Sequence, residues 1–513
     1  MAKYSSALPN GLVALDAGSQ TPLYRQLYDS LRRAILAGQL APGTRLQSSR
    51  EMAAELKVSR NTVVNAFEQL LAEGYLEGQV GSGTYVSRAL PEDLLNAEAV
   101  PRGRPRAAGD RLGLSERGRL FAAYASSPYV AGPRAPEDVR PFLPGVPALD
   151  AFPFDAWSKL VARHWRRPAN ALLGYGEPRG YAPLRRAVAS YLGLSRAVRC
   201  TPEQVIVVDG AQMAFDLIAR VLLDPGDVAW VEEPGYPGAR AALSAAGARL
   251  VYVPVDPEGL DVAAGAGLEP RARLVYVTPS HQFPLGMTMS LPRRLALLDW
   301  ASRAGAWVVE DDFDSEYRYE GRPLAALQGL DREGRVVYVG TFSKVLFPSL
   351  RLGYVVAPPS LVDAFVAARS VAGRHSPSVE QAILTDFIEE GHFGRHIRRM
   401  RTLYRERQTV LVEALRREAG GLLEVEPPET GIHLAAWLGE GLDDREVSRE
   451  AAARGVQARP MSGFYAGSPG RPGLELGYAA FNEEEIRRGA AQLASALSAC
   501  LARRRGGGRR LAV

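Results

Sequence analysis

One lysine and the residues around it could hold a phosphorylated aldehyde. Lys344 follows an apolar run, with Thr341 and Ser343 shortly before it and Arg351 shortly after it. A lysine amine forms a Schiff base with an aldehyde, and hydroxyl groups and an arginine bind phosphate. Asp311 ends an earlier apolar run, where its carboxylate could pair with a pyridinium nitrogen. These residue types predict a binding site for pyridoxal 5'-phosphate (PLP).

Two other segments would add contacts to the same cofactor. Ala211 and Gln212 open a helical pattern after an apolar run, and the amides of a helix N-terminus bind phosphate. Tyr236 follows the next run, where its ring could stack on a pyridine. Asp312 and Asp314 crowd Asp311, which is costly without a nearby cation, and we expect both to serve the structure.

The elements that would position these residues belong to an α/β domain. From residue 120 to residue 502, short apolar runs alternate with helical patterns. The candidate strands are 205–208, 228–231, 274–277, 307–309, 336–339 and 352–356. This alternation predicts a mostly parallel sheet that is buried on both faces. The cofactor residues are expected where these strands end.

Residues 1–87 predict a different kind of domain. Ser48 and Glu51 have the spacing of a capping box, and helical patterns follow over 51–57 and 60–73. Apolar residues on both sides of a glycine-rich stretch then predict a β-hairpin. Helices joined by a tight turn and followed by a hairpin form a winged helix-turn-helix. Such a domain binds double-stranded DNA.

The second of these helices begins with residues that suit DNA recognition. Its first turn carries a cation, an amide and hydroxyl groups, which reach base edges and phosphates from a helix N-terminus in the major groove. The hairpin tip could enter the minor groove. The residues predicted to contact DNA are Arg50, Ser59, Arg60, Asn61, Thr62 and Gly83. By itself, Arg60 would be an ordinary surface arginine, so the prediction depends on the whole pattern.

Length and composition fit several domains. A chain of 513 residues should form two or three. Residues 88–119 are rich in Pro, Gly, Ala and Arg, which predicts a flexible linker. Arginines near the C-terminus predict a basic disordered tail over 503–513. The net charge of +5 permits nucleic-acid binding without demonstrating it.

Cysteine and hydropathy patterns argue against other classes. Cys200 and Cys500 lie far apart, so we expect neither a disulfide framework nor a metal site. This pattern fits a protein of the reducing cytoplasm. No apolar run reaches the roughly 18 residues of a membrane span, and the start lacks the apolar segment of a signal peptide.

The N-terminal segment resembles the GntR family of bacterial winged-helix regulators. The matching motifs are Pro42-Gly43-Thr44-Arg45-Leu46, Ser49-Arg50-Glu51-Met52-Ala53, Val58-Ser59-Arg60-Asn61-Thr62-Val63 and Gly81-Ser82-Gly83-Thr84-Tyr85-Val86. The remainder resembles fold-type I aminotransferases, and nearly the whole chain is similar to the MocR/GabR-type subfamily of GntR regulators. The matching segments there are 171–192, 278–286, 310–319, 340–344 and 350–354.

The resemblance assigns roles to individual residues. Lys344 would form the Schiff base, Asp311 would pair with the pyridine nitrogen and Tyr236 would stack on the ring. The phosphate would be held by Ala211, Gln212, Thr341, Ser343 and Arg351. Tyr175 would reach the phosphate of the other subunit in a homodimer. The implied partners are a DNA operator and a small-molecule effector.

Two positions depart from the family pattern. Phe313 stands where the family commonly has a tyrosine that bonds the cofactor's 3'-oxygen, and phenylalanine cannot form that bond. Glu475 stands near the arginine that pairs with a substrate carboxylate in enzymes of this fold, and a glutamate would repel that group. Arg471 is the alternative partner for such a carboxylate.

Three functional hypotheses follow. The first is a PLP-dependent regulator whose aminotransferase-like domain senses PLP, an amino compound or both, and has at most vestigial transaminase activity. The second is an active aminotransferase with an accessory DNA-binding domain. In the third, PLP itself is the effector. The departure at Glu475 favours PLP over an amino acid as the effector.

Overall fold

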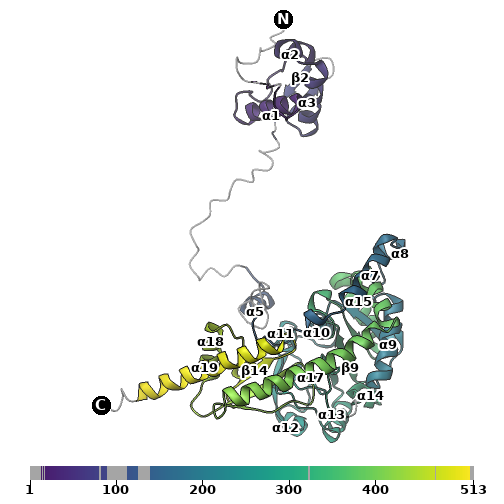
Figure 1. Ribbon diagram of the computed structural model, residues 1–513. Helices are drawn as coiled ribbons and strands as arrows, with labels where there is room; N and C mark the ends of the chain where they lie inside the picture. Colours follow the sequence, from purple (N-terminus) through teal and green to yellow (C-terminus); the bar gives the residue numbers. More distant parts are fainter. Residues whose placement is uncertain are drawn as a thin grey trace. The chain divides into compact units, whose positions relative to one another are not determined.

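The computed structural model describes residues 13–79 apart from 14 and 17, 83–88, 90, 113–124, and 139–508 apart from 322–323 and 468–469. Over 505–508 it describes the backbone alone. The chain forms two units, Met1–Gly113 and Leu114–Val513 (Figure 1).

The first unit is a winged helix-turn-helix. Its elements are α1 (Leu23–Leu36), α2 (Ser49–Leu56), α3 (Arg60–Ala72), β1 (Leu76–Gln79) and β2 (Gly83–Val86). The two strands pair antiparallel in the predicted hairpin. The predicted helices at 51–57 and 60–73 are confirmed to within two residues at each end.

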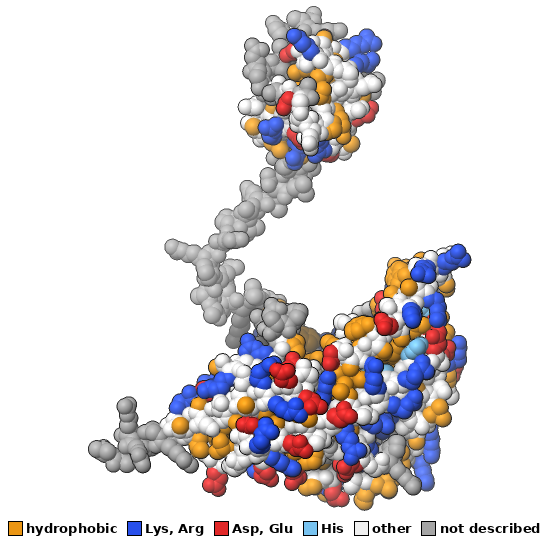
Figure 2. All heavy atoms as spheres, viewed as in Figure 1, with side chains coloured by type: hydrophobic (Ala, Val, Ile, Leu, Met, Phe, Trp, Pro, Cys, Tyr) orange, Lys and Arg blue, Asp and Glu red, His pale blue; other side chains and the backbone are white. Residues whose placement is uncertain are grey.

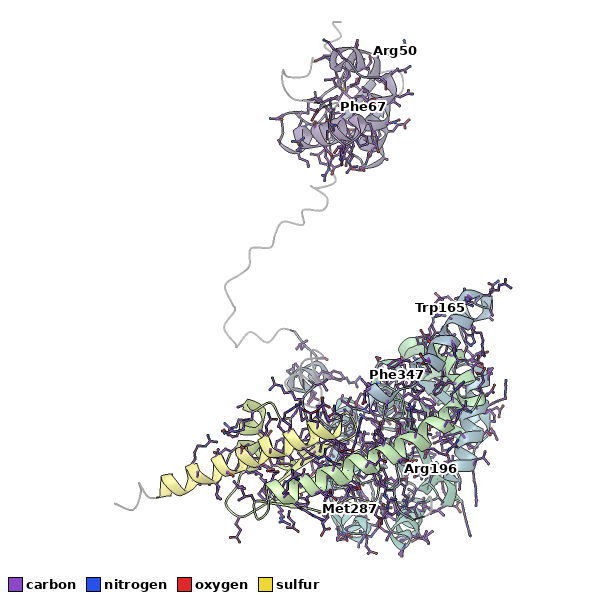
Figure 3. All side chains as sticks on the ribbon, in the orientation of Figure 1. Arg50, Phe67, Trp165, Arg196, Met287 and Phe347 are labelled. Atoms are coloured by element: carbon purple, nitrogen blue, oxygen red, sulfur yellow. The ribbon has the colours of Figure 1, made fainter. Side chains whose placement is uncertain are left out.

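Local hydrogen bonds explain where the helices of this unit begin. The Ser48 side chain accepts a bond from the amide of Glu51, whose carboxylate accepts one from the amide of Ser48. This confirms the capping box, which satisfies donors that would otherwise lack partners. Leu31 of α1 and Leu70 of α3 are fully buried, and Phe67 lies in the same core. Figure 3 labels Phe67 within the unit and Arg50 at its edge.

The second unit is built around an eight-stranded sheet with the order β3-β10-β9-β8-β7-β4-β5-β6. The strands are β3 (Val205–Val208), β4 (Val228–Glu233), β5 (Arg249–Asp256), β6 (Gly259–Leu260), β7 (Leu274–Val277), β8 (Trp307–Asp312), β9 (Val336–Thr341) and β10 (Gly353–Val356). Pairing is parallel from β9 through β5, whereas β10 and β6 run antiparallel to their neighbours. The predicted mostly parallel α/β sheet is confirmed.

Helices cover both faces of this sheet (Figure 1). The helices around the sheet are α9 (Ala182–Arg196), α10 (Ala211–Leu222), α11 (Pro237–Ala245), α12 (Val262–Leu268), α13 (Leu291–Ala304), α14 (Leu327–Leu330), α15 (Val362–Gly373) and α16 (Ser378–Glu389). Helices α7 (Phe154–Arg166) and α8 (Asn170–Leu173) pack against α16. Val205 and Val207 pack with α9 and α16 in one core cluster, whereas Ile206 and Val208 pack with α10 in another. A strand with apolar residues on both faces is therefore buried on both.

A smaller antiparallel sheet has the order β11-β12-β14-β13. Its strands are β11 (Leu423–Val425), β12 (His433–Leu438), β13 (Arg459–Pro460) and β14 (Gly473–Gly477), and it packs with α17 (His392–Glu418), α18 (Asp444–Ala453) and α19 (Glu483–Gly508). This sheet is not among the elements expected from the sequence. Figure 2 shows basic and acidic side chains interspersed on the face along which α17 and α19 lie.

Two predicted boundaries differ from the structure. The segment 88–119 includes the start of α5 (Glu116–Tyr124), which packs against α11 and belongs to the second unit. The predicted disordered tail is wrong up to Gly508, because α19 continues to that residue. Within this segment, Arg503 of α19 pairs with Glu446 and Glu450 of α18. Residues 91–112 and 509–513 lie outside the described residues.

Across the described part of the chain, no helix is both long enough and apolar enough to cross a membrane.

Candidate cofactor site and DNA interface

A cavity of about 280 Å³ lies at the carboxyl ends of β3, β4, β8 and β9 in the second unit. Its lining includes eight of the nine predicted cofactor residues: Ala211, Gln212, Tyr236, Asp311, Thr341, Ser343, Lys344 and Arg351. Tyr175 does not line the cavity, and its side chain is 85% exposed. The fold therefore collects residues that lie far apart in the sequence at one edge of the sheet.

The Lys344 amine is buried and donates to the Gly145 carbonyl at 2.7 Å. Gly145 has a φ of +80°, and a Cβ at this position would lie 2.9 Å from the amine nitrogen. Burial lowers the pKa of Lys344 below its usual range, and the positive charge of the nearby Arg459 lowers it further. A lowered pKa leaves more of the amine neutral and able to act as a nucleophile. The sequence analysis did not identify Gly145.

Asp311 has one satisfied oxygen and one without a partner. The Tyr276 hydroxyl donates to its Oδ2 at 2.6 Å, whereas its buried Oδ1 has no hydrogen-bond partner in the described structure. Burial, opposed by that hydrogen bond, raises the pKa of Asp311 to about 7. A cationic ring nitrogen would satisfy Oδ1 and favour the carboxylate form. The site therefore fits a pyridinium group.

A second part of the cavity lining suits a phosphate. Helix α10 begins at Ala211, so its first backbone amides face the ligand side without helical partners. The Arg351 guanidinium donates to the Asp209 carbonyl at 2.5 Å, which fixes it beside this helix end. A Cβ at Gly210 would lie 3.3 Å from that guanidinium. The Thr341 hydroxyl accepts the amide of Ser343 at 3.2 Å.

Aromatic rings form another part of the cavity lining. Tyr236 packs edge-to-face on Phe283, with ring centroids 5.4 Å apart, and Phe313 lies 6.1 Å from Phe283. All three line the cavity. Burial raises the pKa of Tyr236 to about 12, so its hydroxyl stays neutral. At this edge, Phe283 and Phe313 offer an apolar surface in place of a hydroxyl donor.

The two neighbouring carboxylates bind protein groups, as expected. Asp312 accepts from the Arg196 guanidinium at 2.8 Å, and both side chains are buried. Asp314 pairs with His281 Nδ1 at 2.9 Å. Neither residue lines the cavity, so Asp311 alone of the three faces the ligand space.

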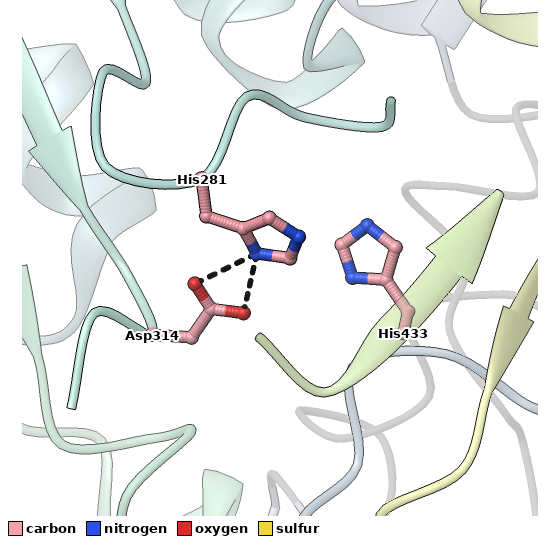
Figure 4. A group of neighbouring side chains, drawn as sticks. All are labelled: His281, Asp314 and His433. Atoms are coloured by element: carbon pink, nitrogen blue, oxygen red, sulfur yellow. Dashed lines mark hydrogen bonds and ion pairs between the residues drawn. The ribbon is translucent and has the colours of Figure 1, made fainter. Parts of the chain in front are cut away.

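Figure 4 shows a buried group that sequence spacing could not reveal: His281, Asp314 and His433. The imidazole rings lie 4.7 Å apart, and both Nε2 atoms lack hydrogen-bond partners among the residues described. Burial, followed by His281, holds the pKa of His433 well below its usual range. A Cβ at Gly431 would lie 1.9 Å from the His281 ring, so the backbone packs closely against it. His433 also lines the cavity.

Arg459 and Glu475 also line the cavity, whereas Arg471, the alternative partner for a substrate carboxylate, does not. Glu475 is 1% exposed, and its Oε2 lies 3.6 Å from Arg459 Nη1. Burial raises the pKa of Glu475, while Arg459 acts in the opposite direction. The alternative that Arg471 serves the cavity is wrong. Arg471, which precedes β14, pairs with Glu424 and lines a separate depression.

The predicted DNA-contacting residues of the first unit lie around the start of α3. The Ser59 hydroxyl caps α3 by accepting from the Thr62 amide at 3.1 Å, so this pair orders the helix start. Arg60 and Asn61 follow with exposed side chains, and Arg60 Nε donates to Ser49 Oγ at 3.3 Å.

Two further predicted contacts flank this helix start. Arg50 is exposed on α2, and Figure 3 labels it at the surface of the unit. Gly83 is exposed at the start of β2, where its φ is +121°. The hairpin tip at 80–82 lies outside the described residues.

Comparisons with known proteins identify both units. Residues 23–86 match the family model for bacterial regulatory proteins of the gntR family, and residues 146–493 match aminotransferase class I and II. The chain is 45% identical over 489 residues to the probable rhizopine catabolism regulatory protein MocR of Rhizobium meliloti, covering 95% of this chain and 96% of that protein. The chain belongs to the MocR-type subfamily of GntR regulators.

Other matches fit this membership. The pyridoxine biosynthesis transcriptional regulator PdxR of Corynebacterium glutamicum is 31% identical over 95% of this chain and 98% of its own length. The solved structure of LysN, an alpha-aminoadipate aminotransferase from Thermus thermophilus complexed with N-(5'-phosphopyridoxyl)-L-leucine, matches with a TM-score of 0.66 and 33% identity. That match covers 74% of this chain and 99% of LysN. The MocR-type chain thus carries a complete aminotransferase fold.

Proposed function

We propose that this protein is a PLP-dependent transcription regulator. The first unit binds an operator in double-stranded DNA, and the cavity around Lys344 binds PLP and senses either PLP or an amino compound. The observation that carries the proposal is the presence, in one chain, of a gntR-type recognition helix and a buried lysine–aspartate cavity. Full-length relatives named as transcription or catabolism regulators support it.

The cavity has the groups that PLP needs. Lys344 would hold the cofactor covalently, Asp311 would pair with its ring nitrogen through the unpartnered Oδ1, and Tyr236 would stack on the ring. The α10 N-terminus and Arg351 would hold the phosphate. When bound, PLP supplies an aldehyde for amines and an electron-withdrawing ring. The phosphopyridoxyl ligand of LysN supports this assignment.

A homodimer is part of the proposal. Tyr175 is 85% exposed, and Arg374 lies 4.7 Å over its ring. The neighbouring helices α7 and α8, here called the arm, also expose Trp165 and Leu173. Figure 3 labels Trp165 at the outer end of this arm. Exposed apolar side chains on one arm suit a protein interface. In a homodimer, Tyr175 would reach the phosphate in the partner's cavity.

An active aminotransferase is the second candidate. Lys344 and Asp311 are the chemical groups that such an enzyme requires, and the similarity to LysN favours it. Glu475 in the cavity lining argues against ordinary amino-acid substrates. Sustained turnover between an amino donor and a keto acid would establish the enzyme, whereas a single stoichiometric conversion would not.

Binding to DNA upstream of its own gene tests the proposal most directly. Fluorescence anisotropy at fixed salt, with and without PLP, should show specific binding that PLP changes. Specific binding that is indifferent to PLP would point to an amino compound as the effector. Absence of specific binding there and at other candidate operators would favour the enzyme.

We place the regulator in the cytoplasm, a location supported by its two free cysteines.

A further inference from the structure

One wall of the cavity comes from the small sheet. Strands β12, β13 and β14 contribute His433, Arg459 and Glu475 to the lining. Glu475 stands directly opposite Arg459 in the pairing of β13 with β14, and the two charges lie 3.6 Å apart. The cation on this wall is therefore next to an anion before any ligand enters.

This arrangement disfavours a ligand carboxylate. A carboxylate that approached Arg459 would also approach Glu475, and two like charges in a buried site oppose each other. Glu475 is 1% exposed, so water does little to screen that repulsion. In the described structure, Lys344 and Arg351 are the other cations of the lining, and they would hold the cofactor's aldehyde and phosphate.

The same wall offers buried acceptor atoms that accept no hydrogen bond from the described residues, although Glu475 Oε2 is ion-paired with Arg459. Glu475 Oε2 and His433 Nε2 are both buried without a hydrogen bond among the described residues. The His433 ring also hydrogen-bonds the Pro284 carbonyl, and it stays neutral because burial disfavours its charged form. The nitrogen that donates to the carbonyl must be Nδ1, since Nε2 has no partner, so Nε2 is left as an acceptor. Buried acceptors of this kind require donors.

We infer that this wall selects an effector amine that carries hydroxyl groups and no carboxylate. Hydroxyl groups donate to Glu475 Oε2 and His433 Nε2, while the Arg459–Glu475 pair stays intact. The amine faces the cofactor held at Lys344. The inference rests on the proposed function, because it requires PLP at Lys344, and it names the chemical class of the amino compound.

Matched ligand pairs test the selectivity. The full-length, PLP-loaded protein is titrated by calorimetry with serinol and with L-serine, which differ in having a hydroxymethyl or a carboxylate group at one position. A second pair is 4-amino-1-butanol and 4-aminobutyrate. We expect each amino alcohol to bind at least about tenfold more tightly than its matched acid. Equal or tighter binding of the acids, or no binding of either amino alcohol, overturns the inference.

A charge-neutral variant identifies the residue responsible. Glu475→Gln keeps the side-chain shape and removes the negative charge beside Arg459, so the preference for the amino alcohol should fall at least about tenfold, with the acids gaining affinity. Arg471→Ala is the matched control, because this arginine lies outside the cavity and should leave both affinities unchanged. An unchanged preference in Glu475→Gln, with a normal circular dichroism spectrum, overturns the assignment of Glu475.

Failure of this inference can be separated from failure of the proposed function. The visible absorption of bound PLP and its dependence on Lys344 are recorded before any titration. If PLP does not bind in this way, the cofactor proposal fails and the effector inference fails with it. If PLP binds and the ligand preference is absent, the effector inference alone fails.

Discussion

The DNA-binding unit and the cofactor cavity present their functional groups in opposite ways. Arg60 and Asn61 are consecutive, exposed residues at the start of one helix. Asp311 is buried on β8, Lys344 is half-buried in the turn after β9, and both have pKa values shifted toward their neutral forms. The first interface depends on one short segment, whereas the second depends on the whole sheet. Substitutions should therefore affect the two regions separately.

The largest expected effect is that of Lys344→Ala. Removing the amine should abolish the adduct with PLP that borohydride reduces, because no other lysine lines the cavity in the described structure. Mass spectrometry of the reduced protein measures the adduct, and circular dichroism checks that the fold persists. A reduced PLP adduct in Lys344→Ala, in the same amount as in the wild type, would refute the assignment of Lys344.

Asp311→Asn should weaken PLP binding next most strongly. Loss of one partner of a buried charge pair costs about 2–5 kcal/mol, and the Asn side-chain oxygen can still accept from Tyr276. Equilibrium dialysis with PLP measures the affinity. Asp363→Asn, on the surface of α15 and outside the cavity, is the control. Equal affinity in wild type and Asp311→Asn would contradict the pairing with the ring nitrogen.

Without cofactor, Asp311→Asn should stabilise the fold at high pH. Burial raises the pKa of Asp311 from 3.8 to about 7, so the folded protein holds a proton that the unfolded chain releases. The buried carboxylate therefore destabilises the fold increasingly as the pH rises between these two values. Asp311→Asn should raise the melting temperature of the PLP-free protein at pH 8 and change it little at pH 4. A lower melting temperature of Asp311→Asn than of the wild type at pH 8 would contradict the prediction that the buried carboxylate lacks a partner without PLP.

Arg60→Ala should weaken operator binding by about 1–3 kcal/mol and leave the absorption of bound PLP unchanged. The exposed guanidinium lies at the start of the recognition helix, where it can reach a base edge or a phosphate. Anisotropy at fixed salt measures the affinity. Arg33→Ala, exposed on α1, is the matched control. If both variants bind the operator as the wild type does, α3 is not the recognition helix.

The smallest effect sharpens the comparison within the first unit. Ser48→Ala removes the capping box and should destabilise α2 by about 1 kcal/mol. Hydrogen exchange of peptides from α2 in the full-length protein should accelerate, with no change around Lys344. Ser495→Ala, an exposed serine within α19, should leave α2 unaffected. Faster exchange around the cavity would show that the two regions are coupled.

Much of the fold could be predicted because its signals are local. The capping box at Ser48 acts over three residues, and the apolar runs that became β3, β4, β7, β8 and β9 are continuous in the chain. The residue types around Lys344 were also sufficient to indicate a cofactor. Some of the missed segments have weak local signals: β13 is two residues long, and α5 begins within a segment whose composition resembles a linker. Strand β5 was also missed, although its eight residues include a continuous apolar run.

The sequence by itself determined which residues could do chemistry: a lysine, a carboxylate and phosphate-binding groups in one region, and a helix start suited to DNA in another. Only the tertiary structure decided what surrounds them. It placed Arg459 beside Glu475, left Arg471 outside the cavity and set His433 in its wall. The physical reason is that helix caps and apolar runs act over a few residues, whereas a cavity wall depends on strand register and packing between distant segments.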